Sequence, residues 1–323
     1  MHPISRRRDR PLPVAAATVL PAGPLTRRSA LLLVPAAIGA LMSQALANDL
    51  VQPVAGAARE AFALAGDLAR SILPAPSART DTPSRAALSK AVLAELGGRS
   101  DVIGVSVLDR RTRIWWHYRG DAAVRSGSVS KVLVLAAAMR KAREEERGLS
   151  ARQREQARLA ITASDNASAD ALYAFAGGHA AIAELARDLG MAATAAAEPA
   201  THWGLTLTTP NDLVRLMDRL TSGSPATHPD DDAAVLDLMT QVIDGQRWGA
   251  GTVRSGSVDV HVKNGWMAVG EPWVINSVGD VRGAGRDYAV ALMQTRQPDQ
   301  DSGIRRASRI GRAVFGALEA PLR

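Results

Sequence analysis

The sequence predicts an α+β fold, an α/β sandwich in which a five-stranded antiparallel sheet is covered by the N- and C-terminal helices and carries an inserted all-helical lobe. Three observations predict this fold. Residues 101–120 alternate between apolar and polar side chains, further strand-like runs lie between 257 and 296, and the stretch from 127 to about 244 has helical periodicity. A chain of 323 residues can bury a large core. We place the main domain at 84–323, because a proline-rich linker ends near Pro83.

The first predicted elements are a helix and a hairpin. Ser84 stands where it can cap a helix that runs to Leu96. The run DVIGVSVLDRRTRIWWHYRG then alternates on both sides of Asp109–Thr112, which predicts two strands joined by a turn. Apolar positions at helical spacing and glycine breaks follow, so we assign the helical lobe to about 123–248.

The C-terminal part predicts three more strands and a closing helix. The strand-like runs SVDVHVKNGWM, EPWVINSVGDV and RDYAVALMQTR are separated by glycine and proline, and an amphipathic helix spans 303–319. Sequential hairpins imply antiparallel pairing, and the first and last helices are then free to cover one face of the sheet. A cleft between the sheet and the helical lobe is a usual place for an active site.

The N-terminal segment predicts export. Residues 1–47 contain six arginines and one acid, so they contribute +5 of the net charge of +7. They include the pair Arg27-Arg28, a short apolar run from Ala30 to Met42 and the small-residue cleavage site Ala45-Leu46-Ala47, which together indicate a twin-arginine signal peptide. An uncleaved anchor is the alternative. Residues 48–83 then form a helix and a proline-rich linker.

Composition excludes several kinds of partner. The remaining chain has no basic stripe interleaved with aromatic residues, so we expect no nucleic-acid partner. With no cysteine we expect neither disulfides nor a lipid-anchored cysteine. The histidines lack ligand spacing, and Asp230-Asp231-Asp232 is best explained as a solvated loop. We therefore predict an exported monomer that has no metal, no cofactor and no stable membrane span after processing.

The first chemical motif is Ser128-Val129-Ser130-Lys131. Ser128 and Lys131 stand at i and i+3, which places them on one face of a helix. A serine is a poor nucleophile without a base, and lysine can serve as that base only when burial or a neighbouring cation lowers its pKa. The backbone amide of Ser128 could also stabilise an oxyanion. By itself, the motif is better explained as a capped helix followed by a solvated lysine.

Two further motifs change that balance. Ser164-Asp165-Asn166 interrupts two apolar helical stretches; it is either a capped turn or a proton shuttle beside a side chain that binds Lys131 or a substrate amide. Lys263-Asn264-Gly265 ends an apolar strand; it is either an Asn-Gly turn or a cation for a substrate carboxylate, with a glycine that admits a ligand close to the backbone.

The order Ser-x-x-Lys, Ser-Asp-Asn, Lys-x-Gly resembles that of the penicillin-recognising serine enzymes, specifically the class A β-lactamase-like family. The resemblance extends to AITASDNASADALYAFAGGHAAIAELARDLG and TLTTPNDLVRLMDRL and covers roughly 84–320, which would make 84–323 a catalytic domain. It implies that Ser128 is acylated, that Lys131 is its base or proton relay, and that Ser164 passes the proton to the leaving nitrogen.

The resemblance also implies a substrate-binding set. Asn166 would orient the substrate, Lys263 would bind its carboxylate, and Asn264 and Gly265 would line the strand beside it. The amide of Trp266 would complete the oxyanion hole.

Three departures separate this sequence from the family's pattern. Asn264 replaces the usual threonine or serine, the segment between Lys131 and Ser164 is short, and the loop before Thr208-Thr209-Pro210 is short. In the family a loop glutamate followed by proline activates the deacylating water, and Glu198 is the candidate here, with a solvated loop carboxylate as the alternative. His202-Trp203-Gly204 could line the cleft, but core packing explains Trp203 better and a loop position explains His202 better.

The leading hypothesis is an exported serine hydrolase that opens a β-lactam or a related amide through an acyl-Ser128 intermediate. A D-alanyl-D-alanine carboxypeptidase or esterase of the penicillin-binding type is the first alternative, with a cell-wall peptide as substrate. A catalytically weak binding protein on the same fold is the second.

Overall fold

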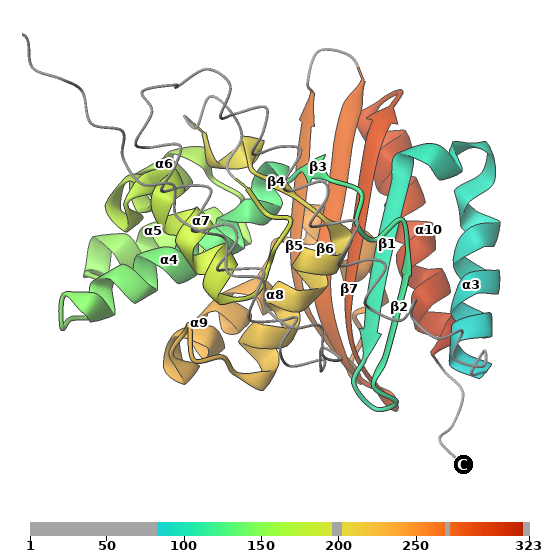
Figure 1. Ribbon diagram of the computed structural model, residues 1–323, viewed down its shortest axis with the longest axis horizontal. Coiled ribbons are helices and arrows are strands. Elements are labelled where there is room, and N and C mark those ends of the chain that lie inside the picture. The colour runs from blue at the N-terminus through green and yellow to red at the C-terminus, as the bar shows by residue number, and fades with distance from the viewer. Residues whose placement is uncertain (1–82, 196–201, 269–271, 319–323) are drawn as a thin grey trace, which may run out of the picture. The chain divides into compact units, whose positions relative to one another are not determined.

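The computed structural model describes residues 83–195, 202–268 and 272–318 (Figure 1). The predicted export signal and almost all of the predicted linker lie outside these ranges. Within them, no helix is long and apolar enough to cross a membrane. In chain order the elements are α3 (Pro83–Leu96), η1 (Gly97–Val102), β1 (Ile103–Asp109), β2 (Ile114–Tyr118), β3 (Val124–Arg125), η2 (Gly127–Ser130), α4 (Lys131–Glu144), α5 (Ala151–Thr162), α6 (Asn166–Ala176), α7 (Gly178–Asp188), η3 (Trp203–Leu205), β4 (Leu207–Thr208), α8 (Pro210–Ser222), α9 (Pro229–Thr240), η4 (Asp244–Gln246), η5 (Gly249–Val253), β5 (Val258–Ala268), β6 (Trp273–Gly283), β7 (Arg286–Gln297) and α10 (Gln300–Ala317), where η marks a short 3-10 helix.

The five-stranded sheet has the order β2-β1-β7-β6-β5, and every neighbouring pair is antiparallel. The predicted hairpin is present, with Asp109 paired to Ile114 at the turn. The three strands predicted in the C-terminal part are present as β5, β6 and β7, and each pairs with the next. The predicted α+β fold with a five-stranded antiparallel sheet is therefore confirmed.

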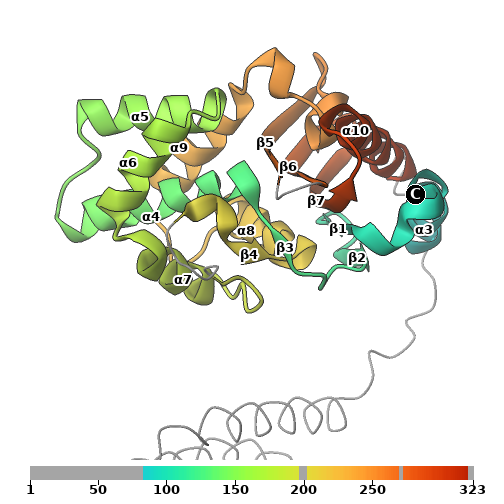
Figure 2. The same cartoon turned by 90° about the horizontal axis from the view of Figure 1, so that it is seen from above.

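The sheet separates two apolar cores. Helices α3 and α10 lie side by side on one face (Figure 2), where Leu88 and Ile310 pack with Val290 and Leu292 of β7. The other face carries α8 and the helical lobe, and Ala291 of β7 belongs to that second core. Successive strand residues thus enter opposite cores, and this explains why β7 is apolar along most of its length.

The inserted lobe is not wholly helical. Val124 and Arg125 of β3 pair antiparallel with Thr208 and Leu207 of β4. Strands of two residues are too short to produce a recognisable alternation, so no pattern in the sequence predicts them. This pairing joins the chain just before Ser128 to the chain just before α8.

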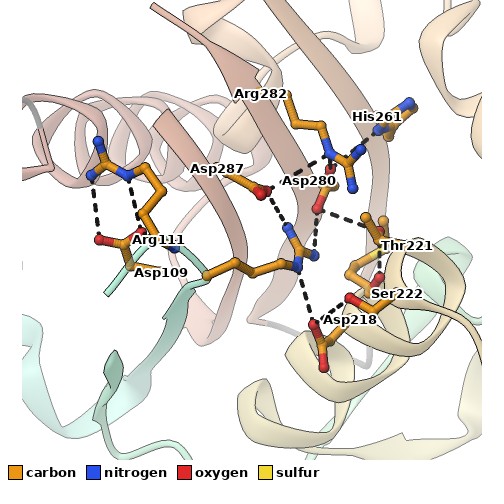
Figure 3. A network of polar contacts seen from close by, with 11 residues as sticks. Asp109, Arg111, Asp218, Thr221, Ser222, His261, Asp280, Arg282 and Asp287 are labelled. Carbon is orange, nitrogen blue, oxygen red and sulfur yellow. Dashed lines mark hydrogen bonds and ion pairs between the residues drawn. The ribbon is translucent and has the colours of Figure 1, made fainter. Parts of the chain in front are cut away.

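A cluster of ions joins the sheet to α8. Arg110 follows β1, and its guanidinium lies 2.6 Å from a carboxylate oxygen of Asp280, 2.8 Å from Asp287 and 3.0 Å from Asp218. Figure 3 shows these three carboxylates converging from β6, β7 and α8. One half-buried guanidinium therefore ties the hairpin turn to two strands of the sheet and to α8.

Candidate active site

Ser128 lies in η2, the short helix that leads directly into α4. The backbone N–H of Lys131 donates to the carbonyls of Ser128 and Val129, which fixes the serine one turn before the lysine. Ser128 is 9% exposed and Lys131 only 1% exposed. The turn therefore keeps the hydroxyl at the edge of the interior and sends the lysine side chain into it.

The ammonium group of Lys131 contacts the Ser164-Asp165-Asn166 turn. Its Nζ lies 2.5 Å from the Ser164 carbonyl oxygen, 3.2 Å from Ser164 Oγ and 2.8 Å from Asn166 Oδ1. All three partners are uncharged. Lys131 is thus well hydrogen-bonded, yet it forms no direct ion pair among the residues that the structure describes.

The backbone of Ser164 explains how one residue supplies two of these contacts. Ser164 has φ of 61°, in the left-handed region that non-glycine residues seldom adopt. It stands between α5 and α6, and Asp165 caps α6 by accepting from the Ser168 N–H at 2.7 Å. The left-handed residue turns the chain so that its carbonyl and hydroxyl both reach Lys131. Such conformations are often found at functional sites.

Lys263 approaches the same hydroxyl from the sheet. It is fully buried on β5, and its Nζ lies 3.0 Å from Ser164 Oγ and 3.0 Å from the carbonyl oxygen of Asn264. Ser164 Oγ therefore stands between two lysine amines that come from opposite layers. A hydroxyl in this position can accept from one amine and donate to the other, so it can relay a proton.

Burial lowers the pKa of both lysines. It lowers the pKa of Lys131 to about 8, although the negative charges of Asp165 and Asp170 act in the opposite direction. Burial, and then repulsion by Lys131, hold the pKa of Lys263 well below its usual value. A substantial fraction of Lys131 is therefore neutral near pH 8 and able to act as a base.

Two glycines let β5 lie directly against η2. A methyl group on Gly265 would lie 2.6 Å from the Ser126 carbonyl oxygen and 2.8 Å from the Ser128 amide nitrogen. A methyl group on Gly127, where φ is 54°, would lie 3.2 Å from the Trp266 amide nitrogen. The amides of Ser128 and Trp266 are consequently carried by two backbone segments in contact, as an oxyanion hole requires.

The structure corrects the expectation for Asn264. Its buried side-chain amide donates to the backbone carbonyls of Gln246 at 2.6 Å and Trp248 at 3.0 Å. Because neighbouring strand residues point to opposite faces, the side chain of Asn264 lies on the face away from Lys263 and Ser164. It therefore holds the η4–η5 segment and does not line the cluster of Lys131, Ser164 and Lys263.

Two further expectations concern a deacylating base and a metal site. Glu198, the candidate deacylating base, lies outside the described residues. Within the described ranges there is no group of three or more histidine, cysteine, aspartate or glutamate side chains that could hold a metal ion.

Two further residues lie at the site: Asn276, for which the sequence predicts no role, and Trp203, for which it mainly predicts core packing. Asn276 is fully buried and donates to the carbonyls of Arg125 at 2.8 Å and Ser126 at 3.1 Å, so it holds the backbone just before Ser128. The only available signal was a polar residue in the apolar run VINSV. The ring of Trp203 lies over Lys131, with 4.6 Å between Nζ and the ring centre.

A sequence comparison decides the family. The profile of the beta-lactamase enzyme family matches residues 146–318, more than half of the chain. The chain belongs to the beta-lactamase enzyme family. The resemblance inferred from the three motifs is therefore confirmed. The matched range includes Ser164, Asn166 and Lys263 and begins after Ser128 and Lys131.

Relatives of this beta-lactamase-family chain agree with its fold. It is 29% identical over 221 residues to the Mycobacterium tuberculosis protein named "Putative lipoprotein LppW", a match that covers 65% of this chain and 68% of that one. A class A beta-lactamase structure from Bacteroides cellulosilyticus matches with a TM-score of 0.64 at 19% identity, over 75% of this chain and all of that one. At that identity the match concerns the fold alone.

A second solved structure has higher identity. A mutant of the last common ancestor of the class A beta-lactamases of Gram-negative bacteria is 26% identical, with a TM-score of 0.60, over 71% of this chain and 98% of that one. The structure named PBP-A matches with a TM-score of 0.61 at 19% identity, over 74% of this chain and 96% of that one. The chain therefore has the fold of class A beta-lactamases.

Proposed function

We propose that this chain is a serine hydrolase that opens a β-lactam, or a related cyclic or peptide amide, through an acyl-Ser128 intermediate. The observation that supports this proposal most strongly is the convergence of two buried lysines on the hydroxyl of Ser164, at 3.2 and 3.0 Å. A structural role explains this arrangement poorly, because burying two amines that ordinarily carry a charge, without a direct counter-ion, is costly.

In the first step, neutral Lys131 accepts the proton of Ser128 while Ser128 Oγ attacks the carbonyl carbon of the substrate. The amides of Ser128 and Trp266 donate to the oxygen of the tetrahedral intermediate. Lys131 then carries the proton as an ammonium, held by Ser164 and Asn166. General base catalysis of this kind typically contributes a factor of about 10² to 10⁴.

In the second step the carbon–nitrogen bond breaks. Ser164 donates its hydroxyl proton to the leaving nitrogen and recovers one from the ammonium of Lys131, so the proton count balances. Lys263 lies on the other side of Ser164, burial holds its pKa well below the usual value, and an approaching substrate carboxylate would favour its charged form. Water then releases the acyl group from Ser128 as the product acid.

The fate of the acyl-enzyme separates two functions. If Glu198 activates the water, the protein is a β-lactamase. The side chain of Asn264 is bound to backbone carbonyls and is not available to a substrate carboxylate. This departure from the family's pattern favours the second candidate, a carboxypeptidase or esterase of the penicillin-binding type. A stalled acyl-enzyme would then accumulate with penicillin.

We further propose that the protein acts in the cell envelope or outside the cell. The predicted twin-arginine segment at residues 1–47 supports export. The relative named as a lipoprotein supports an envelope location in the same way.

The proposal is tested by incubating the protein with benzylpenicillin and following intact mass together with β-lactam hydrolysis. Rapid turnover supports a β-lactamase, and a long-lived adduct that is absent from Ser128→Ala supports the penicillin-binding alternative. If the protein gives neither adduct nor turnover with penicillins and with thioester or depsipeptide substrates, the hydrolase proposal is contradicted. The result then supports the alternative of a binding protein on the same fold. The Glu198→Gln variant then asks whether deacylation depends on this carboxylate, since it should convert turnover into a trapped adduct.

A further inference from the structure

Trp203 covers the ammonium of Lys131 from the side of η3. The indole is 3% exposed, and Lys131 Nζ lies 4.6 Å from the ring centre. A cation over the face of an indole is attracted by the negative charge density of the ring, and the attraction is stronger when the pair is out of water. This contact is in addition to the three hydrogen bonds of Lys131.

The indole is held in place at several points. Its Nε1–H donates to Asp170 Oδ1 at 2.7 Å, and its backbone carbonyl accepts from Ser130 Oγ at 3.0 Å. His202 fixes the start of η3, because its Nδ1 accepts from the Gly204 N–H at 3.0 Å. The contact between Ser130 and Trp203 joins η3 to the helix turn that carries Ser128. The ring is therefore placed by the same segment as the nucleophile.

Few charged side chains act on the ammonium group of Lys131 besides the ring of Trp203. Among the described residues, Asp165 and Asp170 raise the pKa of Lys131 through their charges, and neither forms an ion pair with it. Lys263 faces it across Ser164. The ring of His202 lies 4.5 Å from that of Trp203. The face of Trp203 is thus a direct electrostatic contact of an otherwise weakly compensated ammonium.

We propose that Trp203 is a positioning residue for Lys131, which holds the amine beside Ser164 and stabilises its ammonium form through the face of the indole. The proposal rests on the proposed function for its catalytic meaning. When Lys131 accepts the proton of Ser128 during acylation, charge develops on the amine, and a preorganised ring face stabilises that charge without rearrangement. Asp170, which holds the indole N–H, supports the same arrangement from α6.

The test measures the pKa of Lys131 directly. The chain has only four lysines, Lys90, Lys131, Lys141 and Lys263, so carbon-13 labelling at lysine Cε gives four resonances that Lys90→Arg and Lys141→Arg help to assign. The decisive variant is Trp203→Leu, which keeps an apolar group in place but removes the ring face. Trp203→Phe is the matched control, because it keeps a ring and loses the same hydrogen bond to Asp170. Trp203→Met replaces the leucine variant if that one does not fold.

We expect Trp203→Leu to lower the pKa of Lys131 by about one unit and Trp203→Phe to change it by less than about 0.3 units. The acylation rate with benzylpenicillin, measured against pH, should shift its midpoint by the same amount and lose about fivefold at its plateau in the leucine variant. A leucine variant with the wild-type pKa, or a phenylalanine variant that shifts as far as leucine, would overturn the role of the ring. If the wild-type protein takes no acyl group, the proposed function fails, while the titration still decides the contact.

Discussion

Two clusters of buried charge lie on the same face of the sheet, two residues apart along β5, and they differ in how the charge is compensated. His261 is paired with Asp280 in the register of β5 and β6, and Lys263 follows His261 on the same face. At Asp280 the charge is paired with two guanidinium groups, Arg110 at 2.6 Å and Arg282 at 3.2 Å, and the His261 ring lies 3.4 Å away. At Lys263 the described partners are a hydroxyl and a carbonyl.

The shifts in pKa follow this difference. Burial alone would raise the pKa of Asp280, but the nearby His261 and the charge of Arg110 outweigh it and lower the pKa. For Lys131 the charges of Asp165 and Asp170 oppose the effect of burial without offsetting it, and the nearby charge of Lys131 adds to the effect of burial on Lys263, so both pKa values fall. The same low-polarity interior therefore fixes a charge in one cluster and makes a proton mobile in the other. The first arrangement suits a structural anchor, and the second suits catalysis.

Lys131→Met should give the largest effect and break the reactive cluster alone. Removal of the base is expected to slow acylation of Ser128 by about a thousandfold. The free energy of unfolding should not fall, because the variant also removes a cation that burial disfavours. Acylation kinetics and urea unfolding of the same preparation check both parts. Lys90→Met, an exposed lysine on α3, is the control and should acylate at the wild-type rate.

Asp280→Asn should break the anchoring cluster and give the opposite pattern. Loss of this buried carboxylate removes the nearest counter-ion of the half-buried Arg110 and leaves Asp287 and Asp218, which costs about 3 kcal/mol of unfolding free energy. Urea unfolding measures that loss. The acylation rate at a temperature where the variant is folded should change far less than in Lys131→Met. A variant that is as stable as the wild type would show that the cluster does not anchor the fold.

Dependence on pH sharpens the comparison further. The pKa of Lys131 is about 8 in the folded protein and 10.5 for an ordinary lysine. Between these values the unfolded chain keeps a proton that the folded protein has released, so stability rises with pH. From about pH 7.5 to pH 10, the wild-type unfolding free energy should gain about 2 kcal/mol relative to Lys131→Met. Parallel urea titrations at the two pH values measure it, and equal slopes with pH would contradict the lowered pKa.

Arg143→Ala should give the smallest effect. Arg143 on α4 pairs with Asp231 at 2.5 Å, a short contact between side chains that are 40% and 20% exposed. Exposed ion pairs add little to stability because water and salt screen them. Thermal unfolding of this variant should match the wild type within experimental error at physiological salt. A large loss would mean that surface pairs, as well as the Asp280 cluster, anchor this fold.

Much of this architecture could be predicted from the sequence, because strand alternation, helical periodicity and sequential hairpins are local patterns. The five-stranded sheet and the covering helices followed from them. The β3–β4 pairing could not, since two residues carry no period. The position of the Asn264 side chain could have been predicted, because adjacent residues of a strand point to opposite faces and Lys263 was already assigned to the substrate side.

The site itself was predictable as a set of residues and not as a set of contacts. The motif order brought Ser128, Lys131, Ser164 and Lys263 under consideration together, but only the fold shows that Ser164 Oγ stands between two amines. Trp203 was considered as a residue that could line the cleft, but nothing in the sequence indicated its contact with Lys131. The two residues are more than seventy positions apart, and no local pattern relates a loop tryptophan to a helix lysine.

The contact between Gly127 and Gly265 has a consequence for folding. These glycines are well over a hundred residues apart, and the whole helical lobe lies between them in the chain. Such long-range contacts form late, because the entropy of closing a long loop must first be overcome. The Ser128 amide and the Trp266 amide thus come together only when β5 joins the sheet. Reactivity of Ser128 toward an acylating probe would therefore report completion of folding, and a partly folded chain would be chemically silent.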